Sequence, residues 1–305
     1  MRNIHHLADK INKLKKEKNA VILGHCYQNP EIDLVADFVG DSLQLSRLAA
    51  NTDAKIIVFG GVYFMAETAK ILSPEKKVLL PNIESGCRMS DMVDLKQIRE
   101  FKAMYPDVPV VCYVNSSAEV KAEADICCTS ANAVHVVKSM NVPKVLFAPD
   151  KYLGTYVGNQ LENVEVITYP GYCPTHLGIL VEDVEKAKAE HPNAKVLVHP
   201  ECHQAVTAFA DYIGSTTGIM KYAKESDEKE FIIVTEKGVS DRLTRDYPDK
   251  KFYLVCKRAV CPNMKLNTLE DVLRVLETEE NEITVDEEIA SKARQAIERM
   301  IAING

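Results

Sequence analysis

The sequence lacks the features that would place it in a membrane or on a nucleic acid. It has no uninterrupted apolar run of about eighteen residues, so no segment predicts a membrane-spanning helix. It has no basic excess either, because 37 Lys and Arg stand against 44 Asp and Glu, a formal net charge of −7. Residues 1–20 lack the apolar core and cleavage site of a signal peptide and are typical of a polar amphipathic helix. We therefore expect a cytoplasmic protein with no membrane and no nucleic acid as partner.

Several common ligand-binding motifs are also missing. No Walker sequence and no G-x-G-x-x-G occurs, so nothing predicts a nucleotide-phosphate loop or a Rossmann cofactor site. No C-x-x-C occurs, although the chain has nine cysteines, and an odd number in a reducing compartment argues against a disulfide framework. Cys112, Cys127 and Cys128 lie in apolar strand-like runs and are interpreted as core residues. The remaining cysteines need another account.

What the sequence does contain is a regular alternation of strands and helices. The strand-like runs are short, rich in Val, Ile and Leu, and end at Gly, Pro, Asn or Asp, as in KIIVFGG (55–61) and KVLVHPE (195–201). Amphipathic patterns such as VEDVEKAKAEHPNA separate them. This alternation predicts an α/β fold with parallel sheets covered by helices on both faces.

One short motif occurs three times, at intervals of 88 (124 − 36) and 86 residues (210 − 124). The copies are ADFVGDS (36–42), ADICCTS (124–130) and ADYIGST (210–216). A strand ends eleven residues before each copy (36 − 25, 124 − 113, 210 − 199), at His25, Tyr113 and His199. One cysteine follows the last strand of each third, at intervals of 86 (173 − 87) and 88 residues (261 − 173): Cys87, Cys173 and Cys261. Features that recur in one order at one interval indicate an internal triplication, in which the motif marks equivalent turns of three related units.

The repeat is too long for a solenoid unit and has about the size of a small α/β domain. We therefore predict three similar three-layer αβα domains with parallel sheets around a pseudo-threefold axis. The expected domains are residues 1–86 completed by C-terminal helices in 262–305, residues 87–172, and residues 173–261. The helical region from about Thr268 is expected to pack against the first domain.

Equivalent positions in the three units carry polar side chains. The first strand of each unit ends in a pair spaced by two residues, which points both side chains the same way. The pairs are His25 and Tyr27, Tyr113 and Asn115, and His199 and Glu201. Each repeated motif ends in a hydroxyl, at Ser42, Ser130 and Thr216. These hydroxyls could be plain helix N-caps, or could lie beside helix amides that bind an anion.

The position of these groups favours a shared site. Ligands of parallel sheets bind beyond the carboxyl ends of the strands, so three domains facing one axis would gather the nine side chains in one cavity. Such a cavity suits anions, and Glu201 is the only carboxylate among these nine side chains and the candidate base.

Cys87, Cys173 and Cys261 lie in loops, one after the last strand of each repeated unit. Three thiolates on one axis suit zinc or an iron–sulfur cluster. Three protein ligands leave one metal position open, which is the arrangement of a Lewis-acid catalyst. Two rival readings stay open at this point: a zinc aldolase or hydrolase, and a noncatalytic iron or redox sensor. A sensor ought to carry a partner-binding or DNA-binding element, and the acidic chain shows no basic helix-turn-helix.

Long segments in this order resemble the quinolinate synthase family along essentially the whole chain. They are GHCYQNPEI, ADFVGDSLQLSR, FGGVYFMAETAKIL, YVNSSAEVKAEAD, TSANAV, FAPDKYLG, HPEC, IGSTTGIM and CPNMKLNTLEDV. The resemblance implies an enzyme of NAD biosynthesis that condenses iminoaspartate with dihydroxyacetone phosphate to quinolinate, releasing phosphate and water. It also implies a [4Fe-4S] cluster with one iron open to substrate, held by Cys87, Cys173 and Cys261.

The resemblance further implies which residues meet the substrate. The family's contact positions fall on His25, Ser42, Tyr113, Asn115, Ser130, His199, Glu201 and Thr216, with Tyr27 close to the chemistry. Glu201 with Tyr27 or His25 would move protons, and Tyr113 would orient the intermediate. The usual source of the imine is an aspartate-oxidising enzyme. Two side positions depart from the family: Cys26 replaces an Asn or Tyr, and Tyr172 replaces a His.

Overall fold

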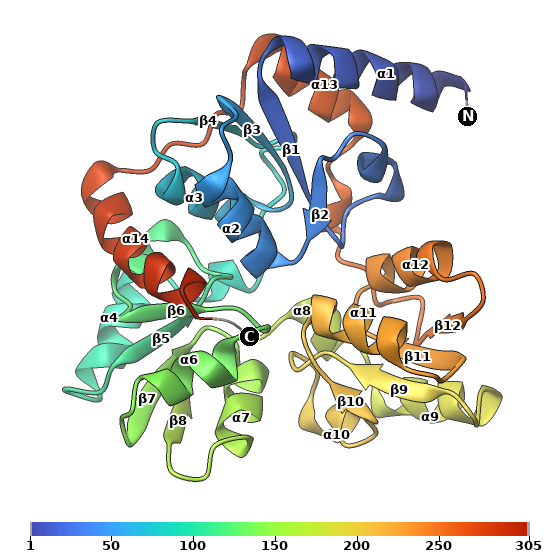
Figure 1. Ribbon diagram of the computed structural model, residues 1–305. Helices are drawn as coiled ribbons and strands as arrows, with labels where there is room; N and C mark the ends of the chain where they lie inside the picture. The colour runs from blue at the N-terminus through green and yellow to red at the C-terminus, as the bar shows by residue number, and fades with distance from the viewer. Residues whose placement is uncertain (1, 304–305) are drawn as a thin grey trace.

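The computed structural model describes residues 2–303 as three lobes, each built on its own four-stranded parallel sheet (Figure 1). The strand orders are β2-β1-β3-β4, β6-β5-β7-β8 and β10-β9-β11-β12. In every lobe the chain starts at an inner strand, moves to one edge, and then crosses to the other side of the first strand. The repeated order confirms the predicted α/β fold of three αβα units.

The first lobe begins with the predicted amphipathic helix, α1 (Arg2–Glu17). Its strands are β1 (Ala20–His25), β2 (Phe38–Gly40), β3 (Ile56–Gly60) and β4 (Lys77–Leu79). Its other helical segments are η1 (Pro30–Leu34), α2 (Ser42–Asn51) and α3 (Tyr63–Leu72). Because helices cover both faces, the inner strands β1 and β3 are buried along nearly their whole length, which explains their continuous apolar runs.

The second lobe repeats this plan. Its strands are β5 (Val110–Tyr113), β6 (Ile126–Cys128), β7 (Lys144–Ala148) and β8 (Glu165–Thr168). Its helical segments are η2 (Ser90–Met92), α4 (Leu95–Ala103), α5 (Ala118–Ala122), α6 (Ala133–Ser139) and α7 (Lys151–Asn159). Cys112, Cys127 and Cys128 are fully buried in β5 and β6, where the apolar pattern placed them.

The third lobe follows the same order. Its strands are β9 (Lys195–Val198), β10 (Tyr212–Ile213), β11 (Glu230–Val234) and β12 (Lys251–Leu254). Its helices are α8 (Pro174–Leu177), α9 (Val181–Glu190), α10 (Gln204–Thr207), α11 (Thr216–Glu225) and α12 (Lys237–Asp246).

The repeated Ala-Asp motif has the same structural role in each lobe. Its aspartate carboxylate accepts a hydrogen bond from a backbone N–H at the start of the first strand. The pairs are Asp37 with Ile22 (2.8 Å), Asp125 with Val110 (2.7 Å), and Asp211 with Val196 (2.8 Å). Each aspartate also donates its own N–H to the carbonyl of the same partner, at 2.8, 3.0 and 2.9 Å. The motif therefore fastens a short edge strand, β2, β6 or β10, where the sequence indicated only a turn.

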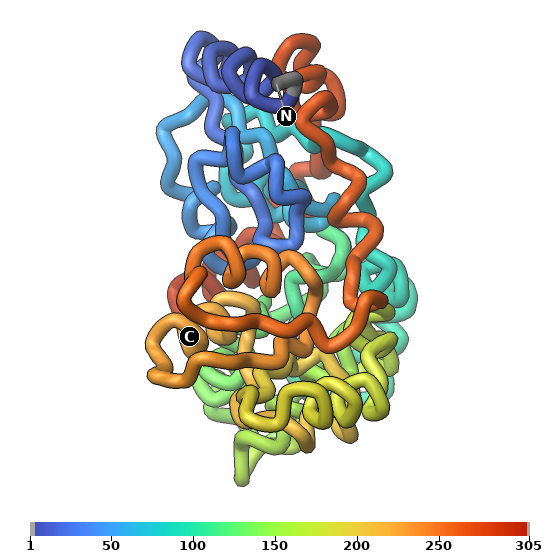
Figure 2. Tube along the Cα trace, turned by 90° about the vertical axis from the view of Figure 1, so that its right-hand side faces the viewer, coloured from blue at the N-terminus to red at the C-terminus, as the bar shows by residue number. Residues whose placement is uncertain are grey.

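The C-terminal segment joins two lobes. After η3 (Asn263–Lys265), helix α13 (Leu269–Thr278) packs against α1 and β3 of the first lobe, as Figures 1 and 2 show at the top of the molecule. Helix α14 (Glu287–Ile301) packs against α3 of the first lobe and against α5 and β6 of the second. Arg47 and Asn132, from these two lobes, both donate to the carbonyl of Ile303. The predicted domain limits remain a prediction.

None of the helices within residues 2–303 combines the length and apolar character that a membrane crossing requires.

Candidate functional site

A cavity of about 230 Å³ lies where the three lobes meet. The structure brings all of the predicted site positions to its wall. They are His25, Tyr27, Ser42, Cys87, Tyr113, Asn115, Ser130, Cys173, His199, Glu201, Thr216 and Cys261. The wall forms because the same strand ends of three lobes face one point, and the roles of these residues remain predictions.

The two strand-end histidines share one local geometry. The backbone N–H of Tyr27 donates to Nδ1 of His25 at 3.1 Å, and that of Glu201 donates to Nδ1 of His199 at 3.3 Å. An occupied Nδ1 places the proton of a neutral imidazole on Nε2, so each ring is a donor at that atom. Burial lowers the pKa of His25 and of His199 to about 3, so both rings are neutral at neutral pH.

Tyr27 bridges the first and third lobes. Its hydroxyl lies 2.9 Å from Oγ1 of Thr216 and 3.1 Å from Oγ1 of Thr235. Burial, reinforced by the charge of Glu201, raises the pKa of Tyr27 well above its usual value. Tyr27 is therefore a neutral phenol whose proton can serve as a hydrogen-bond donor. Its neighbour Cys26 points into the hydrophobic core, so the first departure from the family lies off the cavity.

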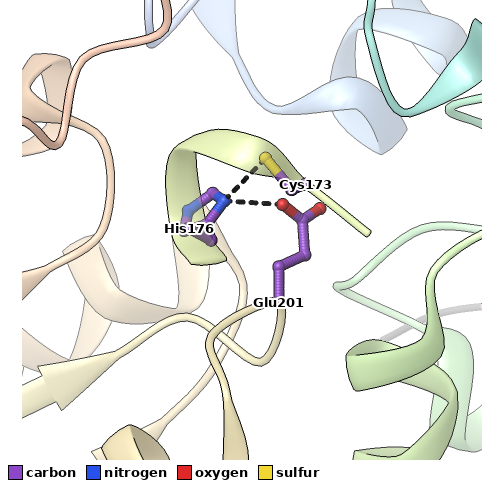
Figure 3. Close-up of side chains that lie close together, drawn as sticks. All are labelled: Cys173, His176 and Glu201. Atoms are coloured by element: carbon purple, nitrogen blue, oxygen red, sulfur yellow. Dashed lines mark hydrogen bonds and ion pairs between the residues drawn. The ribbon is translucent and has the colours of Figure 1, made fainter. Parts of the chain in front are cut away.

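Glu201 has polar partners from two lobes. The hydroxyl of Tyr113 donates to its Oε1 at 2.5 Å, and Nδ1 of His176 lies 2.7 Å from its Oε2 (Figure 3). Burial alone would raise the pKa of Glu201, but His176 and His199 outweigh that effect and lower the pKa to about 2. Glu201 is therefore ionised at neutral pH, as a proton acceptor must be.

His176, in the short helix α8, is a site residue that sequence reasoning missed. Its Nδ1 lies 3.2 Å from Sγ of Cys173 (Figure 3). Its Nε2 lies 2.9 Å from Oγ1 of Thr235. One donor atom each from Cys173, His176 and Glu201 lie within 4.8 Å of one another, close enough to hold a metal ion. The signal was a histidine three residues after a cysteine. The triplication did not mark it, because Ser90 and Met264 hold the equivalent places.

The hydroxyls of the repeated motif are not the helix caps. Asp41 caps α2, Asn132 occupies the N-cap of α6, and Ser215 caps α11. Ser42 and Thr216 are instead the first residues of their helices, and Ser130 precedes its cap. The simpler reading as plain N-caps is therefore wrong, and all three hydroxyls face the cavity.

The three cavity cysteines are positioned by one repeated backbone bond. In each lobe the first residue of the helix after the third strand donates its N–H to a carbonyl two residues before the cysteine. The bonds run from Tyr63 to Ser85 (2.8 Å), from Lys151 to Gly171 (2.8 Å), and from Lys237 to Ala259 (2.7 Å). The pseudo-threefold arrangement thus extends from the sheets to the loops that carry the thiols.

The three cavity thiols share one electrostatic feature, a pKa raised by burial. Burial raises the pKa of Cys87 to about 12, with a further contribution from Cys261. Burial also raises the pKa of Cys173, to which Glu201 and Cys87 add, and that of Cys261. Ionising these buried thiols therefore requires a positive partner, which a bound metal or cluster would supply. No fourth cysteine lines the cavity within residues 2–303, so the donor set fits a cluster held at three corners.

The low pKa of His25 predicts a measurable acid sensitivity. The unfolded chain binds a proton at this residue below about pH 6.5, whereas the folded chain does so only near pH 3, so stability falls as pH decreases through this window. The His25→Gln variant should lose this part of the slope, about 1.4 kcal/mol per pH unit. Urea unfolding of the unmodified chain and of His25→Gln between pH 6.5 and 4 gives the pH dependence of each unfolding free energy. Equal pH dependence in the two proteins would contradict the prediction.

The fold and cavity define a three-lobed α/β protein whose buried acid, phenol, imidazole and thiol groups converge where the lobes meet. The sequence model of the family described as "Quinolinate synthetase A protein" matches residues 9–302. The chain belongs to this family and is an enzyme.

Curated relatives agree with this assignment. A "Quinolinate synthase" of Alkaliphilus metalliredigens is 53% identical over 298 residues, which cover 98% of this chain and 98% of that protein. The "Quinolinate synthase 2" of Methanosarcina acetivorans is 52% identical, with 98% of this chain and 96% of that protein covered. The "Quinolinate synthase" of Caldicellulosiruptor bescii is 51% identical, with 98% and 99% covered.

Proposed function

We propose that this chain forms quinolinate in NAD biosynthesis by condensing iminoaspartate with dihydroxyacetone phosphate. The observation that carries the proposal is the convergence of three thiols, one from each lobe, with anion-binding hydroxyls and a buried carboxylate on one cavity wall. The names of the relatives give the product. The substrates, the cofactor and the roles below are inferred from the chemistry that this wall can perform.

The reactants require a site for anions. They carry two carboxylates and one phosphate, and condensation must release that phosphate and two molecules of water. The chain offers neutral donors for these charges: Nε2 of His25 and of His199, and the hydroxyls of Ser42, Ser130 and Thr216. Asn115 adds a side chain whose Oδ1 has no hydrogen-bond partner within residues 2–303. This oxygen is an acceptor, so it is available to a hydroxyl or N–H group of the substrates and not to their anionic groups.

The same wall can move protons. Ionised Glu201 accepts a hydrogen bond from Tyr113, so the pair can take a proton from the substrate and hold the phenol in a fixed direction. Tyr27 and His25 face the cavity from the first lobe and can return a proton at the phenol oxygen or at Nε2. Tyr113, fixed by Glu201, orients the intermediate.

Cys87, Cys173 and Cys261 would hold a [4Fe-4S] cluster with one iron open to substrate. When bound, such a cluster supplies the Lewis acidity that makes hydroxide a feasible leaving group. His176, next to Cys173 and Glu201, would hold the carboxylate in place beside the thiol.

The hydroxyl of Ser130 should contribute mainly to substrate binding. The Ser130→Ala variant should raise KM about tenfold with a smaller change in kcat, since a hydrogen bond to a charged group is worth about 1.5–3 kcal/mol. The matched control is Ser139→Ala in α6, whose hydroxyl donates to the carbonyl of Val136 at 2.7 Å. Steady-state kinetics with each substrate varied in turn measures both. An unchanged KM for both substrates would remove Ser130 from the anion site.

The proposed function is tested by anaerobic purification followed by two assays. Iron and acid-labile sulfide should be present in equal amounts, about four of each per chain, as a [4Fe-4S] cluster requires. Chromatography should then detect quinolinate when iminoaspartate and dihydroxyacetone phosphate are supplied. Iron without sulfide, or a loaded protein that forms no quinolinate, would refute the proposal.

A second candidate is a zinc enzyme, an aldolase or a hydrolase. The observation that favours it is the compact group of Cys173, His176 and Glu201, which has the thiolate, imidazole and carboxylate donors that zinc accepts. Zinc without sulfide in the anaerobically purified protein would support this reading.

The substrate chemistry also implies a supplier. An imine of aspartate hydrolyses in water, so it must be made close to the time of use. We propose that an aspartate-oxidising enzyme provides it and that the reaction takes place in the cytoplasm.

A further inference from the structure

Two buried carboxylates occupy equivalent places in the second and third lobes. Asp150 is the N-cap of α7 and Glu236 is the N-cap of α12, each directly after the third strand of its lobe. Both side chains are fully buried. The first lobe has Val62 at this place, as the N-cap of α3. The carboxylates are therefore not required by the fold of a lobe, and their presence in two of three calls for a reason.

These caps lie against the cysteine loops. The residue after each cap makes the repeated backbone bond to the loop, as with Lys237 and Ala259 at 2.7 Å. In the third lobe the side chain of the cap also contacts the loop. Oε1 of Glu236 accepts a hydrogen bond from the backbone N–H of Cys261 at 3.2 Å, and Oε2 accepts one from Gly238 at 2.6 Å. Glu236 thus does more than cap its helix.

Lys265 connects this carboxylate to the first lobe. Its ammonium lies 3.2 Å from Oε1 of Glu236 and donates to the backbone carbonyl of Tyr27 at 2.6 Å. Close packing holds the same junction, because a Cβ at Gly238 would lie 2.5 Å from the carbonyl oxygen of Cys26 and 3.0 Å from Cα of Tyr27. The ion pair of Glu236 and Lys265 therefore contacts the backbone of Cys261 on one side and that of Tyr27 on the other.

We propose that Glu236, paired with Lys265, is a positioning residue that sets where Cys261 lies relative to Tyr27. We call the contacts of Glu236 and Lys265 with the backbones of Cys261 and Tyr27 the joint. Under the proposed function, this joint aligns the cluster ligand Cys261 with Tyr27, a proton-transfer group from another lobe. Glu236 is fully buried, whereas the side chain of Lys265 is 21% exposed. Losing either partner therefore leaves an uncompensated charge or an unmatched donor beside the cysteine loop. The assignment of Cys261 as a ligand rests on the proposed function, whereas the joint itself rests on the contacts above.

The test compares the reactivity of the cysteines in the full chain prepared without iron. Iodoacetamide alkylation, followed for each cysteine by peptide mass spectrometry, should speed up about tenfold at Cys261 in the Glu236→Gln variant, the factor that corresponds to about 1.4 kcal/mol. Cys87 should be unchanged, because its lobe has no such carboxylate. Equal acceleration of all three cavity cysteines would indicate general loosening and overturn the proposal, as would no acceleration at Cys261.

Matched variants separate the joint from an ordinary helix cap. Asp150→Asn removes the equivalent carboxylate of another lobe and should leave Cys261 unchanged, as should Glu185→Gln on the exposed face of α9. Lys265→Met should accelerate Cys261 as Glu236→Gln does. The double variant should show no more than the larger single effect, because both residues act through one joint. Additive effects would overturn the proposal.

A second readout uses the iron-loaded chain. In Glu236→Gln, transfer of iron to a ferrous chelator under anaerobic conditions should be about tenfold faster than in the Glu185→Gln control, as expected when one ligand loop is loosened. If the unmodified chain contains zinc and no sulfide, the proposed function fails. The alkylation rate of Cys261 in Glu236→Gln relative to the unmodified chain still decides whether Glu236 positions Cys261. The two failures are therefore distinguishable.

Discussion

Each of the variants Cys87→Ala, Cys173→Ala and Cys261→Ala should fold and yet lack both iron and sulfide after anaerobic purification, with quinolinate formation abolished. The reason is that each lobe contributes one thiol to the cavity, and no other cysteine lines it within residues 2–303 to replace a lost ligand. A [4Fe-4S] cluster with only two cysteine ligands is not expected to stay bound. Iron and sulfide assays with visible absorption spectra measure the outcome.

Cys256→Ala is the matched control for this series. Cys256 follows β12 and precedes Cys261 in the same connecting segment, but it does not line the cavity. This variant should retain full iron and sulfide. A variant of Cys87, Cys173 or Cys261 that kept both at the unmodified level would contradict the ligand set.

The loss of metal in each of the three cysteine variants also distinguishes an iron–sulfur enzyme from a zinc enzyme. A zinc ion held by Cys173, His176 and Glu201 would be lost in Cys173→Ala and kept in Cys87→Ala and Cys261→Ala. His176→Gln would remove such an ion as well. A cluster held by the three cysteines requires equal loss in all three alanine variants and retention of iron and sulfide in His176→Gln.

Glu201→Gln should lower kcat by about 10²–10⁴, the range that a positioned acid or base contributes, while leaving the absorption of the cluster intact. Glutamine keeps the size of the side chain but cannot accept a proton at neutral pH. The substitution also replaces one carboxylate oxygen of Glu201 with an amide NH₂ group, either Oε1 beside Tyr113 or Oε2 beside His176. Turnover equal to that of the unmodified enzyme would refute the base assignment.

Tyr113→Phe is the companion variant. It removes the hydroxyl that donates to Oε1 of Glu201 and leaves the carboxylate ionised. The loss in kcat should be smaller than for Glu201→Gln, because Tyr113 directs the base and the intermediate without accepting the proton. A larger loss than in Glu201→Gln would reverse the two roles. Single-turnover measurements of quinolinate formation would place the loss in chemistry or in product release.

The fold was largely predictable because each repeat consists of local strand and helix patterns that are visible in the sequence. Central parallel strands are covered on both faces, so their apolar runs are visible in the sequence. The short strands β2 and β10 were missed as strands, since they have only three and two residues and lie at a sheet edge. The third edge strand, β6, was visible through the apolar run that holds Cys127 and Cys128. The pairing of these three strands depends on the aspartates of the repeated motif, whose carboxylates bond to residues fifteen positions earlier in the chain.

The residues of the candidate site fall into two groups, those that the repeat made predictable and those that it did not. Positions that recur in all three lobes could be selected by register, and all of them line the cavity. His176 and Glu236 have no such triplicate, since Ser90 and Met264 replace the first and Val62 replaces the second in the lobe that begins the chain. Their importance comes from neighbours in other segments, such as Glu201 for His176 and Lys265 for Glu236.

The sequence by itself determined the triplicated α/β plan, the family and those residues of the shared cavity that recur in all three lobes. Periodicity and spacing carry that information because each lobe is built from local strand and helix patterns. Only the tertiary structure decided which of those residues touch: Tyr27 with Thr216, Tyr113 with Glu201, and Glu236 with both Cys261 and Lys265. These contacts join different lobes or loops, and their distances depend on how three sheets are oriented around one cavity, which no interval along the chain encodes.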